Sequence, residues 1–94
     1  MPPSPIRIGI IGIGQIGRHH LETYRSIPGV EVVAVAGRDP QRTAQAAQET
    51  GVAWWTTDYH QLLAREDINA VSICLHNHLH RPAAEAALRA GKHV

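Results

Sequence analysis

The chain alternates between short runs of β-branched residues and longer segments with helical spacing. Residues 6–11, 30–36 and 70–75 are nearly continuous apolar runs rich in isoleucine and valine. Runs of this length and composition are typical of strands that are covered on both faces of a sheet. We therefore predict buried strands over these three ranges. A shorter strand is predicted over 52–55, where Val-Ala-Trp-Trp follows a glycine.

Two helices are predicted between the first three strands. From residue 15 to residue 27, small or apolar residues recur three or four positions apart, and a Pro-Gly pair ends the run. The second helix is alanine-rich, with Asp39 as a suitable N-cap and Pro40 at its first position. It is expected to end near Thr50, because Gly51 can take the left-handed conformation of a C-terminal cap.

Two further helices and the start of a fifth strand complete the pattern. Asp58 is expected to cap a brief helix that carries Leu62 and Leu63. The last helix is predicted over 82–90, because it would begin at a proline and stop at a glycine. Residues 92–94 then resemble the opening of a fifth strand, so the sequence is expected to stop inside an element.

Strands that alternate with helices in this way favour an α/β fold. Each strand–helix–strand unit is a crossover connection, and repeated crossovers build a doubly wound parallel sheet of the Rossmann type. We expect one domain over 6–94, truncated near the fifth strand. Residues 1–5 contain three prolines and are expected to form a disordered lead-in.

Composition and charge narrow the classes of function. The 94 residues are 44% hydrophobic and 18% charged, with a formal net charge of +1. This balance excludes intrinsic disorder and leaves no basic face for nucleic acid. No apolar run is long enough to cross a bilayer and the start has no signal-peptide pattern, so neither a membrane partner nor export is expected. The single cysteine, Cys74, excludes an internal disulfide and favours a cytoplasmic location.

The segment Gly12-Ile13-Gly14-Gln15-Ile16-Gly17 fits the pattern G-x-G-x-x-G. It follows a predicted buried strand and opens a predicted helix, which is the setting that dinucleotide binding requires. Gly12 can form the tight turn, Gly14 leaves room for a pyrophosphate against the backbone, and Gly17 lets the helix lie close to the strand. The positive end of the helix dipole would then face the phosphates. The alternative is a turn whose glycines serve packing alone.

The end of the second strand bears on the choice of cofactor. A carboxylate there would hold the ribose 2′-hydroxyl of NAD, but this chain has Gly37-Arg38. Glu31 lies at the opposite end of the strand, and Asp39 is explained as a helix cap. The missing acid also disfavours an adenosine-methionine methyltransferase. Arg38 could pair with a 2′-phosphate, so we favour NADP over NAD; the alternative for Arg38 is a solvated loop cation.

Three histidines follow the fourth strand at the alternate positions 76, 78 and 80. In an extended segment this spacing would place three imidazoles on one side, where they could hold zinc. No nearby cysteine or carboxylate completes such a site, and in this fold the carboxyl ends of strands line a ligand crevice. We therefore expect no metal, and place Asn77 and His80 in the crevice near the cofactor.

Other candidate side chains receive no catalytic role. His19 and His20 are expected at the surface or the edge of the core, and Trp54 and Trp55 are expected to divide between core and surface because neighbours on a strand face opposite ways. Cys74 is expected to be an inert small hydrophobe, because no cation or base has an evident route to it.

Together these motifs resemble the N-terminal cofactor domain of the Gfo/Idh/MocA oxidoreductases, the glucose-fructose oxidoreductase and inositol dehydrogenase family. The resemblance covers nearly everything from residue 6 onward. It is carried by residues 8–14, the Arg38-Asp39-Pro40 opening of the second helix, Asn77 and His80, and most specifically by 90–94. Members often carry Thr-Pro where this chain has Leu75-His76, and many carry an acid in place of Gly37.

The resemblance implies an NAD(P)-dependent oxidoreductase of sugars, polyols or related hydroxylated compounds, which transfers hydride between a carbinol carbon and nicotinamide. In the family a Glu-Lys-Pro lysine and a second, mostly β domain follow this region. The chain alone is therefore expected to lack catalytic residues and activity, and a small-molecule substrate is expected only in the full-length protein. The alternative is a non-catalytic, dinucleotide-binding regulator or interaction protein.

The predicted cofactor-binding residues are Gly12, Gly14, Gln15, Ile16, Gly37, Arg38, Leu75, Asn77 and His80.

Overall fold

The computed structural model describes residues 6–12, 14–75 and 77–94. Strands and helices alternate along the chain in the order β1 (Ile6–Ile11), α1 (Gln15–Arg25), β2 (Val30–Ala36), α2 (Pro40–Thr50), β3 (Trp54–Thr56), α3 (Tyr59–Leu63), β4 (Ala70–Ile73) and α4 (Asn77–Arg89). Among these described residues no helix is both long enough and apolar enough to pass through a bilayer.

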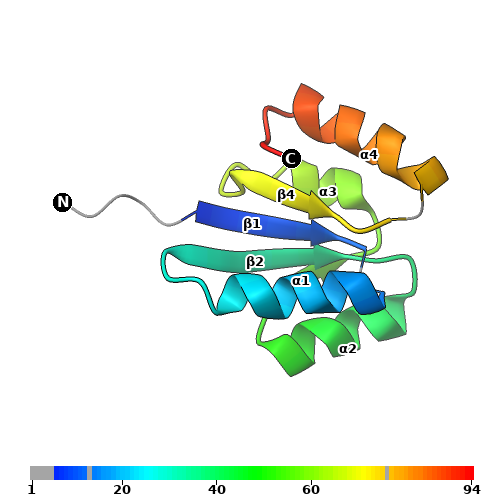
Figure 1. The fold of residues 1–94 in the computed structure, drawn as a ribbon. Helices are drawn as coiled ribbons and strands as arrows, with labels where there is room; N and C mark the ends of the chain where they lie inside the picture. The colour runs from blue at the N-terminus through cyan, green and yellow to red at the C-terminus, as the bar shows by residue number, and fades with distance from the viewer. Residues whose placement is uncertain (1–5, 13, 76) are drawn as a thin grey trace.

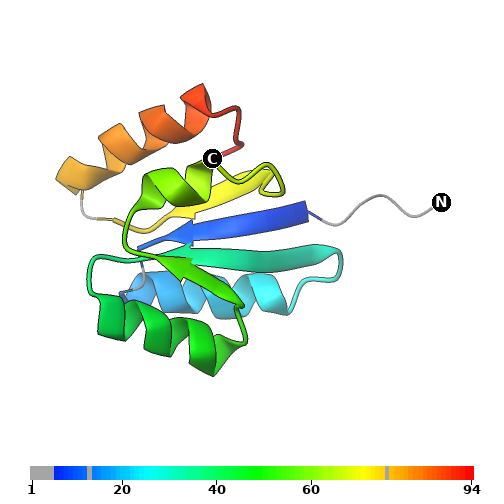
Figure 2. The same ribbon diagram turned by 180° about the vertical axis from the view of Figure 1, so that it is seen from behind.

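The strands form one parallel sheet in the order β3-β2-β1-β4. Figure 1 shows β2, β1 and β4 side by side, and β3 is the short green strand in front in Figure 2. A fifth position begins beside β4, where His93 forms a parallel bridge with Ala70. The N–H of Val71 donates to the carbonyl of His93 at 2.8 Å, and the N–H of His93 donates to the carbonyl of Asn69 at 3.0 Å. This is the strand order of a Rossmann-type doubly wound sheet, as predicted.

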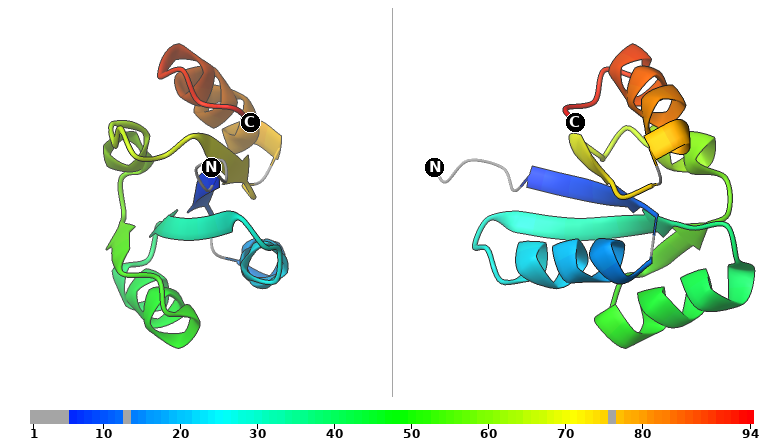
Figure 3. Two further views of the ribbon diagram at one scale, coloured as in Figure 1. Left: turned by 90° about the vertical axis from the view of Figure 1, so that its left-hand side faces the viewer. Right: turned by 45° about the vertical axis from the view of Figure 1, so that its right-hand side comes forward.

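Helices cover both faces of the sheet, and each face has its own hydrophobic core (Figures 1 and 3). On one face, Leu21 of α1 and Ala47 of α2 pack on alternate strand residues such as Ile10. The other face is in front in Figure 2. There, Leu62 of α3 and Ala87 of α4 pack on strand residues that point the opposite way, such as Ile11. The buried hydrophobic residues are isoleucine, valine, leucine and, most often, alanine, and the small alanine side chains let the helices approach the sheet closely.

A bulge in β2 adjusts which side chains reach each core. Ile8 lies opposite Val32, whereas the next residue, Gly9, lies opposite Ala34, so Val33 is the extra residue. Val33 and Ala34 both pack on the α3 and α4 side, and the alternation resumes beyond them. A Cβ on Gly9 would lie 2.6 Å from Cδ2 of Leu62. The glycine therefore makes the space that lets α3 approach β1.

The ends of α2 match the local signals in the sequence. The Asp39 carboxylate accepts hydrogen bonds from the N–H groups of Gln41 and Arg42 at 2.9 and 3.4 Å. Gly51 has a φ of +74° and caps the other end. The N–H of Val52 donates to the carbonyl of Ala47 at 2.9 Å, and both side chains enter the same core, which is a Schellman ending. Val52 therefore belongs to the helix end, and β3 covers 54–56 instead of the predicted 52–55.

Three other predicted boundaries were wrong. The first helix ends at Arg25 and not at residue 27, and β4 ends at Ile73 and not at residue 75. The last helix begins at Asn77, five residues before the prediction, and contains Pro82. Pro82 lacks the N–H that would bond to the carbonyl of residue 78, so the helix continues through it with one backbone hydrogen bond fewer.

Candidate dinucleotide-binding site

The β1–α1 turn lies at the carboxyl end of the sheet, between the ends of β2 and β4. The N–H of Gly12 donates to the carbonyl of Ala36 at 2.7 Å. Gly12 has a φ of +96°, and a Cβ there would lie 2.5 Å from the carbonyl oxygen of Cys74 and 3.0 Å from Cδ2 of Leu75. Only glycine fits this conformation and this space without strain, which supports the tight-turn role predicted for Gly12.

Gly14 follows in a different setting. It is the N-cap of α1, with an ordinary φ of −64°. Apart from its two chain neighbours, no heavy atom of the described residues lies within 4 Å of the position that its Cβ would take. The backbone of Gly14 therefore borders open space at the start of the helix, which is the room that a pyrophosphate would need.

The N-terminus of α1 also has no side-chain cap and no acidic residue in its first turn. By contrast, Asp39 caps α2 and Asp58 caps α3 through their carboxylates. Gln15 and Ile16 are the first two residues of α1, so their backbone N–H groups are among those that the helix itself leaves unpaired. These donors, together with the helix dipole, favour an anion at this position. Ile13 and the surroundings of residues 15–18, including the packing predicted for Gly17, lie outside what the structure describes.

The end of β2 lies next to this turn. The N–H of Gly37 donates to the carbonyl of Thr56 at 3.1 Å, which holds β2 to β3 where both strands end. The Arg38 side chain is exposed and has no hydrogen-bond or ion-pair partner among the described residues. Asp39 is engaged as the cap of α2. Glu31 lies at the other end of β2, with Oε2 3.6 Å from Nε of Arg7.

The segment after β4 forms the other side of the turn. Leu75 is half-buried against the core on the α3 and α4 side and lies beside Gly12. Asn77 opens α4, and the His80 side chain is exposed on that helix. The structure thus brings Leu75 to the glycine turn, whereas no hydrogen bond or ion pair among the described side chains joins His80 or Arg38 to it, and the Asn77 side chain lies outside what the structure describes.

The extended conformation that would place the histidines on one side is not found at positions 78 and 80. Residues 78 and 80 both lie in α4, and helical residues two positions apart are separated by about 200° around the axis. Alternate spacing therefore does not place them on one side, while His76 lies outside the described residues. Within the described ranges, no three potential metal ligands from histidine, cysteine, aspartate and glutamate are grouped together.

A polar chain of side chains between α1 and β4 has no signal in the sequence pattern. Nδ1 of His20 lies 3.1 Å from Oγ of Ser72, and Oγ of Ser72 lies 3.7 Å from Sγ of Cys74. The expectation that no base has a route to Cys74 is therefore wrong, because Ser72 connects it to an imidazole. His20 and Ser72 are 52 positions apart, so no local spacing could have indicated the pair.

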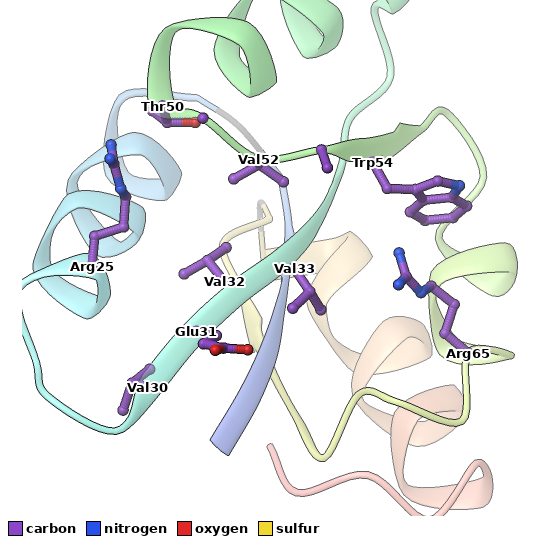
Figure 4. Close-up of a pocket in the computed structure, with 11 residues that line it drawn as sticks. Arg25, Val30, Glu31, Val32, Val33, Thr50, Val52, Trp54 and Arg65 are labelled. Atoms are coloured by element: carbon purple, nitrogen blue, oxygen red, sulfur yellow. The ribbon is translucent and has the colours of Figure 1, made fainter. Parts of the chain in front are cut away.

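A depression on the described surface lies at the opposite end of the sheet. Its volume is about 510 Å³, and Figure 4 shows it between the start of β2, the α2–β3 connection and Arg65. Trp54 lines it and is half-buried, whereas Trp55 is exposed, as predicted for strand neighbours. The Arg65 guanidinium lies 5.0 Å from the centre of the Trp54 ring. Since this depression lies at the amino ends of the strands, it is separate from the glycine turn.

Arg65 also fixes one carboxylate beside the depression. Its Nε and Nη2 atoms donate to the two oxygens of Asp67 at 2.9 and 2.6 Å. These hydrogen bonds hold the pKa of the Asp67 carboxyl below its ordinary value, against the opposing effect of partial burial. The Nζ of Lys92 donates to the carbonyl of Arg65 at 2.6 Å, so the cluster ties the α3–β4 connection to the segment after α4.

Comparison with known proteins places this arrangement among dehydrogenases. The chain is 37% identical over 89 residues to 4-carboxy-2-hydroxymuconate-6-semialdehyde dehydrogenase of Sphingobium sp. (strain NBRC 103272 / SYK-6), which is 95% of this chain and 28% of that protein. The structure of scyllo-inositol dehydrogenase from Lactobacillus casei with bound NAD(H) and scyllo-inositol is 33% identical, with a TM-score of 0.88, over 96% of this chain and 27% of that one. A 3-ketoreductase from Actinomadura kijaniata, in complex with TDP-benzene and NADP, is 37% identical with a TM-score of 0.89, over 96% and 28%.

The chain thus spans little more than a quarter of the length of these three relatives. A family model described as "Oxidoreductase family, NAD-binding Rossmann fold" matches residues 6–94, which confirms the resemblance inferred from the motifs. The chain belongs to the Gfo/Idh/MocA oxidoreductase family, of which it contains the NAD-binding Rossmann fold.

Proposed function

We propose that the chain binds a nicotinamide dinucleotide across the carboxyl end of its sheet, with the diphosphate against the β1–α1 turn. One observation carries this proposal: the space over Gly14 is open, and it faces the uncapped N-terminus of α1. A diphosphate placed there would accept hydrogen bonds from backbone N–H groups and gain from the helix dipole. No side chain on Gly14 opposes its approach.

The residues proposed to hold the cofactor divide according to its parts. The diphosphate would lie on Gly12, Gly14, Gln15 and Ile16, and the adenosine ribose beside Gly37 and Arg38. The loop after β4 would face the nicotinamide half. Its proposed contacts are Leu75, Asn77 and His80.

We further propose that NADP is preferred over NAD. The Arg38 guanidinium is exposed and has no partner among the described residues, so it is free to form two hydrogen bonds with a 2′-phosphate. Neither Glu31 nor Asp39 is placed to accept from a ribose 2′-hydroxyl, because one lies at the far end of β2 and the other caps α2. The relatives include structures with NAD(H) and with NADP, so the fold accommodates either cofactor.

For the whole protein we propose hydride transfer between nicotinamide and a carbinol or carbonyl carbon of a sugar, polyol or related compound. The matched relatives include inositol dehydrogenases and sugar-nucleotide reductases, which supports this substrate class. Nicotinamide supplies the hydride chemistry when it is bound, whereas these 94 residues would bind and orient the cofactor. We assign them no general acid or base.

Calorimetric titration with NADP and NAD tests the cofactor assignment. We expect the wild-type chain to bind NADP more tightly than NAD, and Arg38→Ala to reduce the affinity for NADP about tenfold, because a charge-assisted bidentate contact is lost. The affinity for NAD should remain within about twofold. Arg25→Ala is the matched control, since Arg25 is also an exposed arginine but lies at the opposite end of the sheet.

Two results would contradict these assignments. A wild-type chain that binds neither dinucleotide would remove the proposed function. A preference for NAD that Arg38→Ala leaves unchanged would remove the role of Arg38 while leaving the site itself intact.

A further inference from the structure

One hydrogen bond between side chains joins α1 to β4, the two elements on either side of the candidate dinucleotide-binding site. His20 lies in the second turn of α1, and Ser72 lies in the middle of β4. Nδ1 of His20 and Oγ of Ser72 are 3.1 Å apart and partly buried. In the described part of the chain, no other side-chain hydrogen bond links α1 to β4.

The imidazole of His20 is held on a second side as well. The ring of Tyr24 meets it edge-on, with 6.2 Å between the ring centres and an interplanar angle of 78°. Tyr24 in turn packs against the core on the α1 and α2 side. The His20 ring is therefore contacted from both the Tyr24 side and the β4 side, whereas its neighbour His19 is exposed and has no side-chain contact of this kind among the described residues.

The two elements joined by this contact serve different halves of the proposed ligand. The first turn of α1 would hold the diphosphate, and β4 leads through Leu75 into the loop proposed to face the nicotinamide half. The contact is close to the place where these elements meet, since Ser72 is two residues before Cys74, whose carbonyl crowds Gly12. A shift of β4 relative to α1 would therefore change the distance between the two half-sites.

We infer that His20 is a positioning residue for the nicotinamide half of the cofactor, acting through Ser72 to fix β4 and its loop relative to α1. This inference rests on the proposed dinucleotide site. Its physical basis is preorganisation: a loop held in place before binding does not have to be ordered by the ligand. The adenosine half lies on β1, α1 and β2, so it should be insensitive to the link.

The inference is tested by comparing a dinucleotide with half of itself. The affinities of the chain for NADP and for 2′,5′-ADP are measured by calorimetry, with NAD and ADP as the pair if NAD is the tighter ligand. His20→Leu and Ser72→Ala should each weaken binding of the dinucleotide about threefold to tenfold, because each removes the hydrogen bond. Binding of the ADP half should change by less than about twofold.

Three further variants separate positioning from general loosening of the fold. His20→Asn keeps a polar amide near the place of Nδ1 and should recover most of the dinucleotide affinity. The double variant His20→Leu with Ser72→Ala should be no weaker than either single variant, since both remove the same contact. His19→Leu is the matched control and should leave both affinities unchanged. If His20→Leu does not fold, as judged by urea melting, Ser72→Ala removes only one oxygen atom and still gives the comparison.

The inference is overturned if His20→Leu and Ser72→Ala weaken both ligands equally, or weaken neither. It is also overturned if the effects of the two substitutions add fully in the double variant. If the wild-type chain binds 2′,5′-ADP as tightly as NADP, the nicotinamide half adds no affinity. That result contradicts the inference and leaves the proposed function intact. A wild-type chain that binds neither ligand contradicts the proposed function, and the inference with it.

Discussion

The two described glycines of the β1–α1 turn have opposite surroundings. Gly12 combines a left-handed φ of +96° with a carbonyl oxygen 2.5 Å from its missing Cβ, whereas Gly14 has an ordinary φ and open space. Gly12 is therefore required by the fold, because any side chain there would push the end of β4 away. Neither a left-handed φ nor a crowded neighbour requires glycine at position 14, so the proposed diphosphate has room at that point.

Gly12→Ala should destabilise the chain by about 1–3 kcal/mol, because it adds backbone strain and a steric clash with the Cys74 carbonyl. Urea unfolding followed by circular dichroism measures the change. A midpoint equal to that of the wild type would show that the turn relaxes freely, and would contradict the tight packing of β1 against the end of β4.

The Arg65–Asp67 pair should make a small contribution to stability that depends on pH. Because the folded state holds the Asp67 pKa below its ordinary value, the contribution is present above about pH 4 and is lost as the pH falls through the lowered pKa. Asp67→Asn should cost less than about 1 kcal/mol at pH 7, since both side chains are partly exposed to water. Urea melts at pH 7 and pH 3 measure the difference in free energy of unfolding between wild type and variant. This difference should be smaller at pH 3, and a larger difference at pH 3 would contradict the lowered pKa of Asp67.

Among the elements, α2 was predicted correctly because its end signals are local. Asp39, Pro40 and Gly51 begin or end the helix through contacts with residues no more than four positions away. The residue types at these positions are therefore enough to predict the helix ends. The bulge at Val33 and the contact between His20 and Ser72 depend on neighbours from distant parts of the chain. Pro82 misled the prediction of α4 because proline is common at the first helical position, but here the helix had already begun at Asn77.

Removal of the α2 cap gives a prediction at this scale. Asp39→Ala should lower the free energy of unfolding by about 1 kcal/mol, because the N–H groups of Gln41 and Arg42 lose their acceptor. Glu22→Ala on the exposed face of α1 should change it by less than about 0.5 kcal/mol and serves as the control. Equal urea midpoints for the two variants would show that the cap does not stabilise α2.

At the scale of the whole molecule, the two ends of the sheet differ in what they offer a ligand. The amino end has a depression lined by three charged side chains, of which Arg65 and Glu31 already face partners in Asp67 and Arg7, while the third, Arg25, is exposed. The carboxyl end has an uncapped helix, an open glycine and an arginine without a described partner. Parallel topology places the carboxyl ends of β1, β2 and β4 together, so the glycine motif at the end of β1 predicts the site at this edge of the sheet, where we propose it. The contacts of Asn77 and His80 with a cofactor stay predictions.

The most direct test of this account is a titration of Gly14→Val with NADP. We expect the variant to keep a free energy of unfolding within about 1 kcal/mol of the wild type, because a Cβ at this position meets no described residue beyond its chain neighbours. We expect its affinity for NADP to fall at least about tenfold, because the side chain would obstruct the diphosphate. Ala53→Val, which adds bulk at the opposite end of the sheet, should bind NADP as the wild type does. Wild-type affinity in a folded Gly14→Val chain would contradict the placement of the diphosphate on the β1–α1 turn.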